Sequence, residues 1–254
     1  LYSDYESGVL AKEDFLDIVR LVESYVFRRA VCDIPTNALN RVFANFAKSI
    51  DTRAYLESVK AAFLLMPEYK RFPDDEEFML GLKRRDLYNF PRRTYWLRRI
   101  ENHGRKERVI VEDYTIEHIL PQNENLPREW REALGDDWKQ VQTQYLNTLG
   151  NLTLTGYNTE YSDRPFAMKR DMIGGFKESP LRLNEGLGTV QVWNADSIEK
   201  RAERLACLAC DVWSAPCLVA EVLEKYRPEE SKRERGFSIE DHPHLSEDSL
   251  MRPL

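Results

Sequence analysis

The chain has 254 residues, of which 37 are Lys or Arg, 43 are Asp or Glu and 42% are hydrophobic. At about 150 residues per domain, this length predicts one large domain or two modest ones. The hydrophobic fraction is sufficient for a folded core, which excludes a wholly disordered chain, and no apolar run approaches the roughly 18 residues of a membrane span.

The four cysteines are too few for a disulfide framework, so we expect a protein of the reducing cytoplasm without a membrane segment or a secretory signal. Three of them, Cys207, Cys210 and Cys217, crowd into one stretch. Cys207 and Cys210 form one CxxC without a second pair. We therefore interpret them as small apolar residues on a buried helix face, and not as zinc ligands.

Residues 1–84 predict a set of helices that serve as a scaffold. Between residues 15 and 63, apolar side chains recur every three or four positions, which is the period of helices with one buried face. The last of these helices should end before Pro67, and a short further helix should follow Pro73. None of them carries a group of residues that suggests chemistry.

Residues 83–108 form the most basic part of the chain. Ten basic residues stand there against three acidic ones, an excess of seven, and four aromatic residues are interleaved. Within an acidic chain this excess indicates a candidate phosphate-binding face. The residues that we expect to contact a nucleic acid are Arg92, Arg93, Arg98 and Arg99. The alternative is a solvated helix face whose apolar and aromatic residues pack inward.

The centre of the chain predicts a strand, a helical insertion, a second strand, a turn and a helix. β-Branched residues favour the strands, and Pro and Gly mark the breaks. The predicted elements are a strand within 108–120, helices over 127–134 and 136–149, a strand over 152–154, a helix capped by Asp163 that ends near 173, and a last long helix over 195–213.

Polar residues stand where these predicted elements meet. They are Glu117 and His118 at the end of the first strand, Asn151 at the start of the second, Asn158 in the turn and Lys169 on the next helix. Neighbouring residues of a strand point to opposite faces, so Glu117 and His118 can share one role only where the backbone curls. Taken singly, each residue also has an ordinary structural explanation.

Several separated blocks resemble the nuclease domain of the GmrSD family of type IV, modification-dependent restriction endonucleases. The blocks are TIEHILPQ (115–122), LGNLTLTGYN (149–158) and the spacing of Ser162, Phe166 and Lys169, with YWLRRIE (95–101) and the segment from Trp193 to Trp213 also similar. The resemblance covers about residues 85–225, which we expect to be the nuclease domain. Residues 1–84 would precede it as the helical scaffold, and residues 226–254 would follow it as a linker or disordered tail. The family's nucleotide-hydrolysing half, which has its own signature, is not expected among these residues.

The resemblance implies an α+β, mostly α-helical fold, in which a helical N-terminal region precedes a ββα-metal (HNH-like, His-Me finger) core. His118 would be the general base that deprotonates the attacking water, and Asn151 would hold the loop that orients it. Glu117, where the family often has Asp, and Asn158 would bind one Mg²⁺ or Mn²⁺ ion. Lys169 would meet a neighbouring phosphate.

The leading hypothesis is therefore a metal-dependent endonuclease domain that hydrolyses DNA phosphodiester bonds, with modified phage DNA as its partner. Two alternatives stay open. In one, a non-catalytic domain binds nucleic acid through the basic stretch and the site has decayed. The presence of all four site residues, Glu117, His118, Asn151 and Asn158, argues against this. In the other, the substrate is RNA, because the metal and the base contact phosphate and not the sugar.

Overall fold

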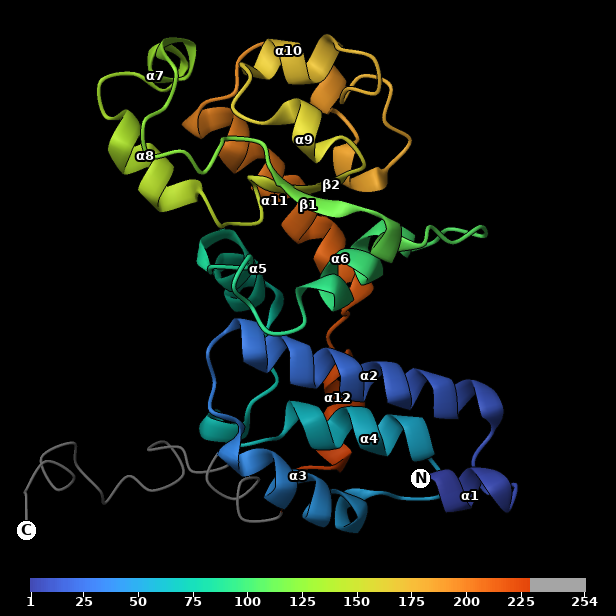
Figure 1. The fold of residues 1–254 in the computed structure, drawn as a ribbon. Helices are drawn as coiled ribbons and strands as arrows, with labels where there is room; N and C mark the ends of the chain where they lie inside the picture. The colour runs from blue at the N-terminus through green and yellow to red at the C-terminus, as the bar shows by residue number, and fades with distance from the viewer. Residues whose placement is uncertain (229–254) are drawn as a thin grey trace, which may run out of the picture. The chain divides into compact units, whose positions relative to one another are not determined.

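The computed structural model describes residues 1–228 (Figure 1). The chain forms two compact units. The first unit contains residues 1–18, 38–71 and the segment from 216, and the second unit contains residues 19–37 and 72–215. Helices dominate both, and the described chain has one sheet, of two strands, so the predicted α+β, mostly helical class is confirmed. Residues 1–84 contribute to both units, and their role as a scaffold stays a prediction.

The first unit consists of short helices. They are α1 (Tyr2–Glu6), the beginning of α2 (Lys12–Val31), α3 (Leu39–Phe46), α4 (Tyr55–Leu64) and α12 (Ala220–Lys225). Helix α4 ends before Pro67, as predicted. The Tyr226 hydroxyl donates to Glu57 on α4 at 2.8 Å, which ties the segment after α12 to this unit. Helix α12 was not predicted, and the part of the predicted tail from residue 229 onward lies outside the described residues.

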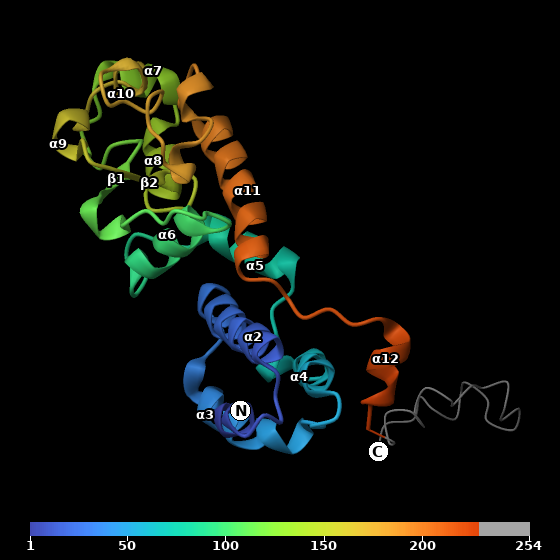
Figure 2. The same cartoon turned by 90° about the vertical axis from the view of Figure 1, so that its right-hand side faces the viewer.

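The second unit carries the remaining elements. They are most of α2, then α5 (Asp75–Arg84), α6 (Arg93–Asn102), β1 (Thr115–His118), α7 (Arg128–Leu134), α8 (Trp138–Tyr145), β2 (Leu152–Thr155), α9 (Asn158–Tyr161), α10 (Phe166–Asp171) and α11 (Ala195–Val212). Helix α11 begins with a capping box, in which Asn194 and Ser197 satisfy each other's main-chain N–H groups. Helix α5 packs against α11 (Figure 2).

Two predicted elements differ from the structure. The β-rich run over 108–120 forms only the four-residue strand β1, because residues 111–113 make a 3₁₀ turn before it. The helix predicted from Asp163 begins at Phe166, directly after Pro165, and a separate short helix, α9, precedes it. Proline has no main-chain N–H, so it suits the start of a helix better than its interior.

The two strands form an antiparallel pair in which Glu117 pairs with Thr153 and His118 with Leu152. We call this pair the hairpin, although the segment between its strands contains helices α7 and α8. The hairpin is anchored where β2 begins. A Cβ atom on Gly150 would lie 2.4 Å from the main-chain oxygen of Ile198, so only glycine allows α11 to pass this closely. The Arg201 guanidinium on α11 donates to the Gly150 carbonyl at 2.7 Å. Contacts with helix α11 therefore fix the position of the start of β2.

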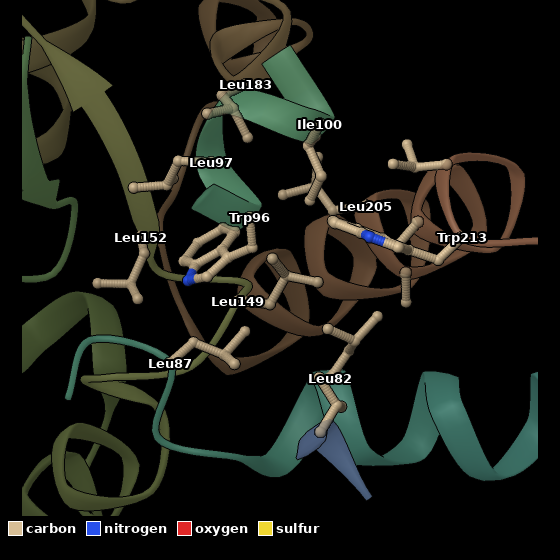
Figure 3. Packing of buried hydrophobic residues seen from close by; sticks show 14 of the residues in the cluster. Leu82, Leu87, Trp96, Leu97, Ile100, Leu149, Leu152, Leu183, Leu205 and Trp213 are labelled. Carbon is tan, nitrogen blue, oxygen red and sulfur yellow. The ribbon is translucent and has the colours of Figure 1, made fainter. Parts of the chain in front are cut away.

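Two hydrophobic clusters enclose the hairpin. The larger one joins α5, α6, β2 and α11, and it includes Trp96, Leu152, Leu205 and Trp213 (Figure 3). The smaller one contains the residues that follow β1 together with side chains from α7, α10 and the segment before α11. Fully burying each large apolar side chain stabilises the fold by about 1.5–3 kcal/mol. The apolar residues of α6 pack inward, as the alternative interpretation of the basic stretch predicted.

The cysteines differ in part from the prediction. None of the four, all of which lie in the described part of the chain, forms a disulfide; Cys210 packs against the larger cluster, but Cys207 is exposed. Among residues 1–228, no three or more His, Cys, Asp or Glu side chains gather as a metal site. None of the helices in that range is both long and apolar enough to cross a membrane.

Candidate active site

His118 ends β1 and is only 6% exposed. Its Nε2 atom lies 3.0 Å from Oδ1 of Asn147, which stands in the turn between α8 and β2. The Nδ2 group of Asn147 donates in turn to Oδ2 of Asp86 at 3.0 Å. The ring of Tyr88 packs edge-on against the imidazole, with 4.5 Å between ring centroids. The imidazole is therefore held both by a hydrogen bond and by an aromatic contact.

Burial lowers the pKa of His118, because desolvation disfavours the imidazolium ion. The hydrogen bond to the Asn147 oxygen and the negative charge of Asp86 act in the opposite direction, and the charges of Lys169 and Arg93 reinforce the lowering of the pKa. With an ordinary pKa near 6.5 as the starting point, His118 is neutral at physiological pH. A neutral imidazole can accept a proton.

Asn151 is fully buried and uses its whole amide group. Its Oδ1 accepts from the Leu120 N–H at 2.7 Å and from Trp193 Nε1 at 3.2 Å. Its Nδ2 donates to the carbonyls of Leu120 and Leu146, both at 3.0 Å. Asn151 thus holds the segment two residues beyond His118, and its predicted role in orienting His118 stays a prediction.

Glu117 leaves β1 on the face opposite to His118 and is 4% exposed. Its Oε1 atom accepts from Lys169 Nζ at 2.7 Å. The same ammonium group donates to the main-chain carbonyls of His118, at 3.3 Å, and Ile119, at 3.1 Å. Burial raises the pKa of Glu117 and lowers the pKa of Lys169, and their attraction opposes both shifts.

The position of Lys169 corrects the prediction that it meets a phosphate. Its side chain is 0% exposed, and its three N–H groups are used by three acceptors at the end of β1. The sequence shows a lysine on a short polar helix, which is usually solvated. Only the packing of α10 against β1 turns this lysine inward.

Asn158 is the first residue of α9 and is exposed. Its Nδ2 group donates to the carbonyl of Ile116 at 3.4 Å, which places it beside β1. Glu117 and Asn158 supply a carboxylate and an amide oxygen, the donor type of a hard cation. One oxygen of Glu117 is already used by Lys169, so only its other oxygen is available to a cation.

The four predicted arginine contacts do not form one array. Arg99 is paired with Glu23 at 2.9 Å, and Arg98 lies 3.4 Å from a carboxylate oxygen of Glu112. Arg92 is exposed. Arg93 donates to the Tyr88 carbonyl at 2.9 Å, and its guanidinium lies 4.6 Å from the centroid of the Tyr88 ring. Through Tyr88, Arg93 is the arginine of the four that borders His118.

The sequence interpretation did not identify Asp86, Tyr88 or Asn147. Asp86 and Tyr88 lie within the basic stretch, where a count of charges draws attention to the arginines and not to an acidic or aromatic residue. Asn147 lies just before the LGN motif that marks the start of the second strand. Its closeness to that motif was the one feature of the sequence that could have indicated a place in the site. These three residues meet His118 only because the loops after α5 and α8 come together.

Residues 72–208 match the family described as GmrSD restriction endonucleases, C-terminal domain. The chain belongs to this family. The matched residues lie in the second unit and include β1, β2 and the residues that surround His118. Because GmrSD proteins are restriction endonucleases, the chain carries a DNA endonuclease domain and DNA is its substrate. No curated protein and no solved structure matches the chain.

Proposed function

We propose that the second unit is a metal-dependent, HNH-like endonuclease domain of a type IV restriction system, and that His118 is its general base. One observation supports this most strongly. In a GmrSD domain, a buried imidazole with a lowered pKa stands at the end of a strand, with its Nε2 held by Asn147. The order of β1, β2 and the following helices is that of a ββα core, with the imidazole on the first strand.

The chemistry is a hydrolysis. His118 takes a proton from a water molecule, and the water oxygen attacks phosphorus as the bond to the 3′ oxygen breaks. The electron pair of that bond leaves with the 3′ oxygen, which takes a proton from solvent. The products are a 5′-phosphate and a 3′-hydroxyl group. A positioned base contributes a rate increase of about 10²–10⁴-fold to such a step.

Other residues of the chain support this step. Asn151 keeps the segment after β1 in place, so that His118 keeps its position. Lys169 fixes the carboxylate of Glu117 and the main chain of His118 from the other face. Arg92 and Arg93 are the arginines best placed to contact a DNA phosphate, because Arg98 and Arg99 are paired with carboxylates.

Glu117 and Asn158 are the residues that would hold Mg²⁺ or Mn²⁺. Such a cation supplies positive charge that stabilises the phosphate in the transition state. In an in-line displacement the attacking and leaving oxygens are on opposite sides of phosphorus. In this reaction His118 would act on the attacking oxygen.

The biological role that we infer is cleavage of modified phage DNA in the cytoplasm. It rests on the type IV character of the family that the sequence resembles. The substrate experiment is a comparison of unmodified plasmid DNA with phage DNA that carries hydroxymethylated or glucosylated cytosine.

The central test is nicking of supercoiled plasmid and of modified phage DNA with Mg²⁺ or Mn²⁺. We expect cleavage by the wild-type chain, and no detectable cleavage by His118→Ala or in the presence of EDTA. His103→Ala is the matched control, because His103 lies in the turn after α6 and has no part in the site. A His118→Ala protein that cuts at the wild-type rate would show that His118 is not the base. A wild-type chain that cuts neither DNA with either ion would contradict the nuclease assignment.

A further inference from the structure

His118, Asn147 and Asp86 form a continuous chain of hydrogen bonds. The three residues come from the end of β1, the turn after α8 and the loop after α5. The main chain strengthens this arrangement, because the carbonyl of Asn147 accepts from the N–H of Leu87 at 2.8 Å. The two loops are therefore joined next to the side chains that form the chain of bonds.

The direction of these hydrogen bonds is fixed by Asp86. Its Oδ1 accepts from the main-chain N–H of Asn89 at 2.8 Å, and its Oδ2 accepts from the side-chain amides of Asn89 and Asn147. Burial would raise the pKa of Asp86, but these hydrogen bonds outweigh burial and lower it, so the group is a carboxylate at neutral pH. A carboxylate only accepts hydrogen bonds.

The consequence reaches His118. The Asn147 amide must turn its NH₂ toward Asp86 and its oxygen toward the imidazole. An amide oxygen accepts, so Nε2 of His118 must carry the hydrogen that it donates. In a neutral imidazole the other nitrogen, Nδ1, then has the lone pair. Among residues 1–228, no side chain or main-chain group is hydrogen bonded to Nδ1.

We propose that Asp86 and Asn147 are positioning residues that fix His118 in the Nε2–H tautomer and so make Nδ1 the atom that accepts the proton of the attacking water. The proposal rests on the proposed function of His118 as the base. When Nδ1 gains the proton, the Nε2–H group of the imidazolium still donates to Asn147. The negative charge of Asp86 then stabilises the cation through the amide, without itself taking a proton.

Tyr88 and Arg93 complete the positioning. The Tyr88 ring limits rotation of the imidazole, and Arg93 holds the Tyr88 loop through its carbonyl and its ring. His118 is thus fixed in tautomer by Asn147 and in ring orientation by Tyr88. Residues that orient a metal-bound imidazole in this way typically contribute about 10–100-fold to metal affinity or activity, and we expect a factor of the same size for His118.

Asp86→Asn is the decisive variant, because it reverses the chain of hydrogen bonds without changing its shape. The oxygen of the new amide stays on the main-chain N–H of Asn89, so its NH₂ faces Asn147. The side-chain amides of Asn89 and Asn147 must then both turn over, and the Asn147 amide presents its NH₂ to Nε2 of His118. We expect His118 to shift toward the Nδ1–H tautomer, and the cleavage rate to fall by about 10–100-fold.

The first readout is the ¹⁵N spectrum of the imidazole rings in the 254-residue chain, labelled at histidine. The chain has four histidines, and the His118 signal is identified by its absence in His118→Ala. In the wild type we expect a protonated Nε2, an unprotonated Nδ1 and a slowly exchanging Nε2–H. Asp136→Asn, an equal change of charge at an exposed position after α7, should alter neither the spectrum nor the rate.

A second variant guards against an effect on folding. Asn147→Ala should lose the slowly exchanging Nε2–H signal and about 10–100-fold in rate, while the far-UV circular dichroism spectrum stays that of the wild type. If Asp86→Asn changes neither the tautomer nor the rate while His118→Ala is inactive, the proposed role of Asp86 and Asn147 is wrong. The assignment of His118 as the base then stands. If the tautomer shifts as expected but His118→Ala cuts like the wild type, Asp86 and Asn147 do control the tautomer. The proposed function of His118 as the base then fails.

Discussion

The two faces of β1 hold their polar residues in opposite ways. On one face, the Nδ1 atom of His118 has no hydrogen bond to any described residue, and the imidazole is oriented by Asn147. Asn147 is in turn hydrogen bonded to the exposed carboxylate of Asp86. On the other face, Glu117 is joined to Lys169 in a buried ion pair whose ammonium group has no N–H left for another partner. Two adjacent residues of one four-residue strand therefore have different tasks.

This difference separates an imidazole that is held for proton transfer from a carboxylate that is held in an ion pair, which leaves one Glu117 oxygen for a cation. The His118 face leaves one functional atom available and fixes everything around it. The Glu117 face joins a carboxylate and two main-chain carbonyls to one lysine, which stabilises the strand end on which His118 stands. Each of the following variants changes one face or the hairpin between them, and so tests whether the two faces differ as described.

Lys169→Met should have the largest effect on stability. It leaves Glu117 and two carbonyls buried without their donor, and loss of one partner of a buried ion pair typically costs about 3–5 kcal/mol. The free energy of unfolding, measured by urea titration, should fall by this amount. Lys200→Met removes an exposed i,i+4 pair with Asp196 and should cost no more than about 0.5 kcal/mol. Equal losses in the two variants would show that the Glu117 face is not a structural anchor.

Gly150→Ala should have the next largest effect, because it acts on the hairpin that both faces share. The added methyl group would lie 2.4 Å from the main-chain oxygen of Ile198, and neither strand nor helix can move away freely. Overpacking of this kind costs about 1–3 kcal/mol. Gly156→Ala, where a Cβ meets no atom within 4 Å, is the matched control in the same hairpin. Thermal unfolding of both variants measures the difference.

Most of the longer helices and the two strands could be predicted because their signals are local, whereas the short helices α1, α9 and α12 were not predicted. Apolar periodicity, Pro67 and the LGN break each act within a few residues, and the family resemblance added the order of the blocks around His118. The resemblance also led to Asn151, which contacts the segment after β1 and whose role in orienting His118 stays a prediction. Short strands and 3₁₀ turns are less predictable, because the same β-branched residues occur in both.

The partners of the site could not be predicted, because they depend on contacts between distant segments. Lys169 meets Glu117 across 52 positions of sequence, and Asn147 meets Asp86 across 61. No local pattern records whether a lysine on a helix faces solvent or the end of a strand. For the same reason the charges of the basic stretch could be counted, but the sequence did not show which of its arginines are paired with carboxylates.

A comparison of Arg93 with Arg99 should show the smallest effect and gives the most specific test, since both residues lie on α6 and carry the same charge. Arg93 borders His118 through Tyr88, whereas Arg99 is bound to Glu23 by its guanidinium. If Arg93 contacts a phosphate, Arg93→Ala should reduce the slope of log affinity against log salt by about 0.9. Arg99→Ala should leave the slope unchanged. Fluorescence anisotropy with a labelled duplex, in the His118→Ala background that cannot cut it, measures both slopes. An equal reduction for both variants would mean that DNA follows the whole helix and that the Glu23 pair opens on binding.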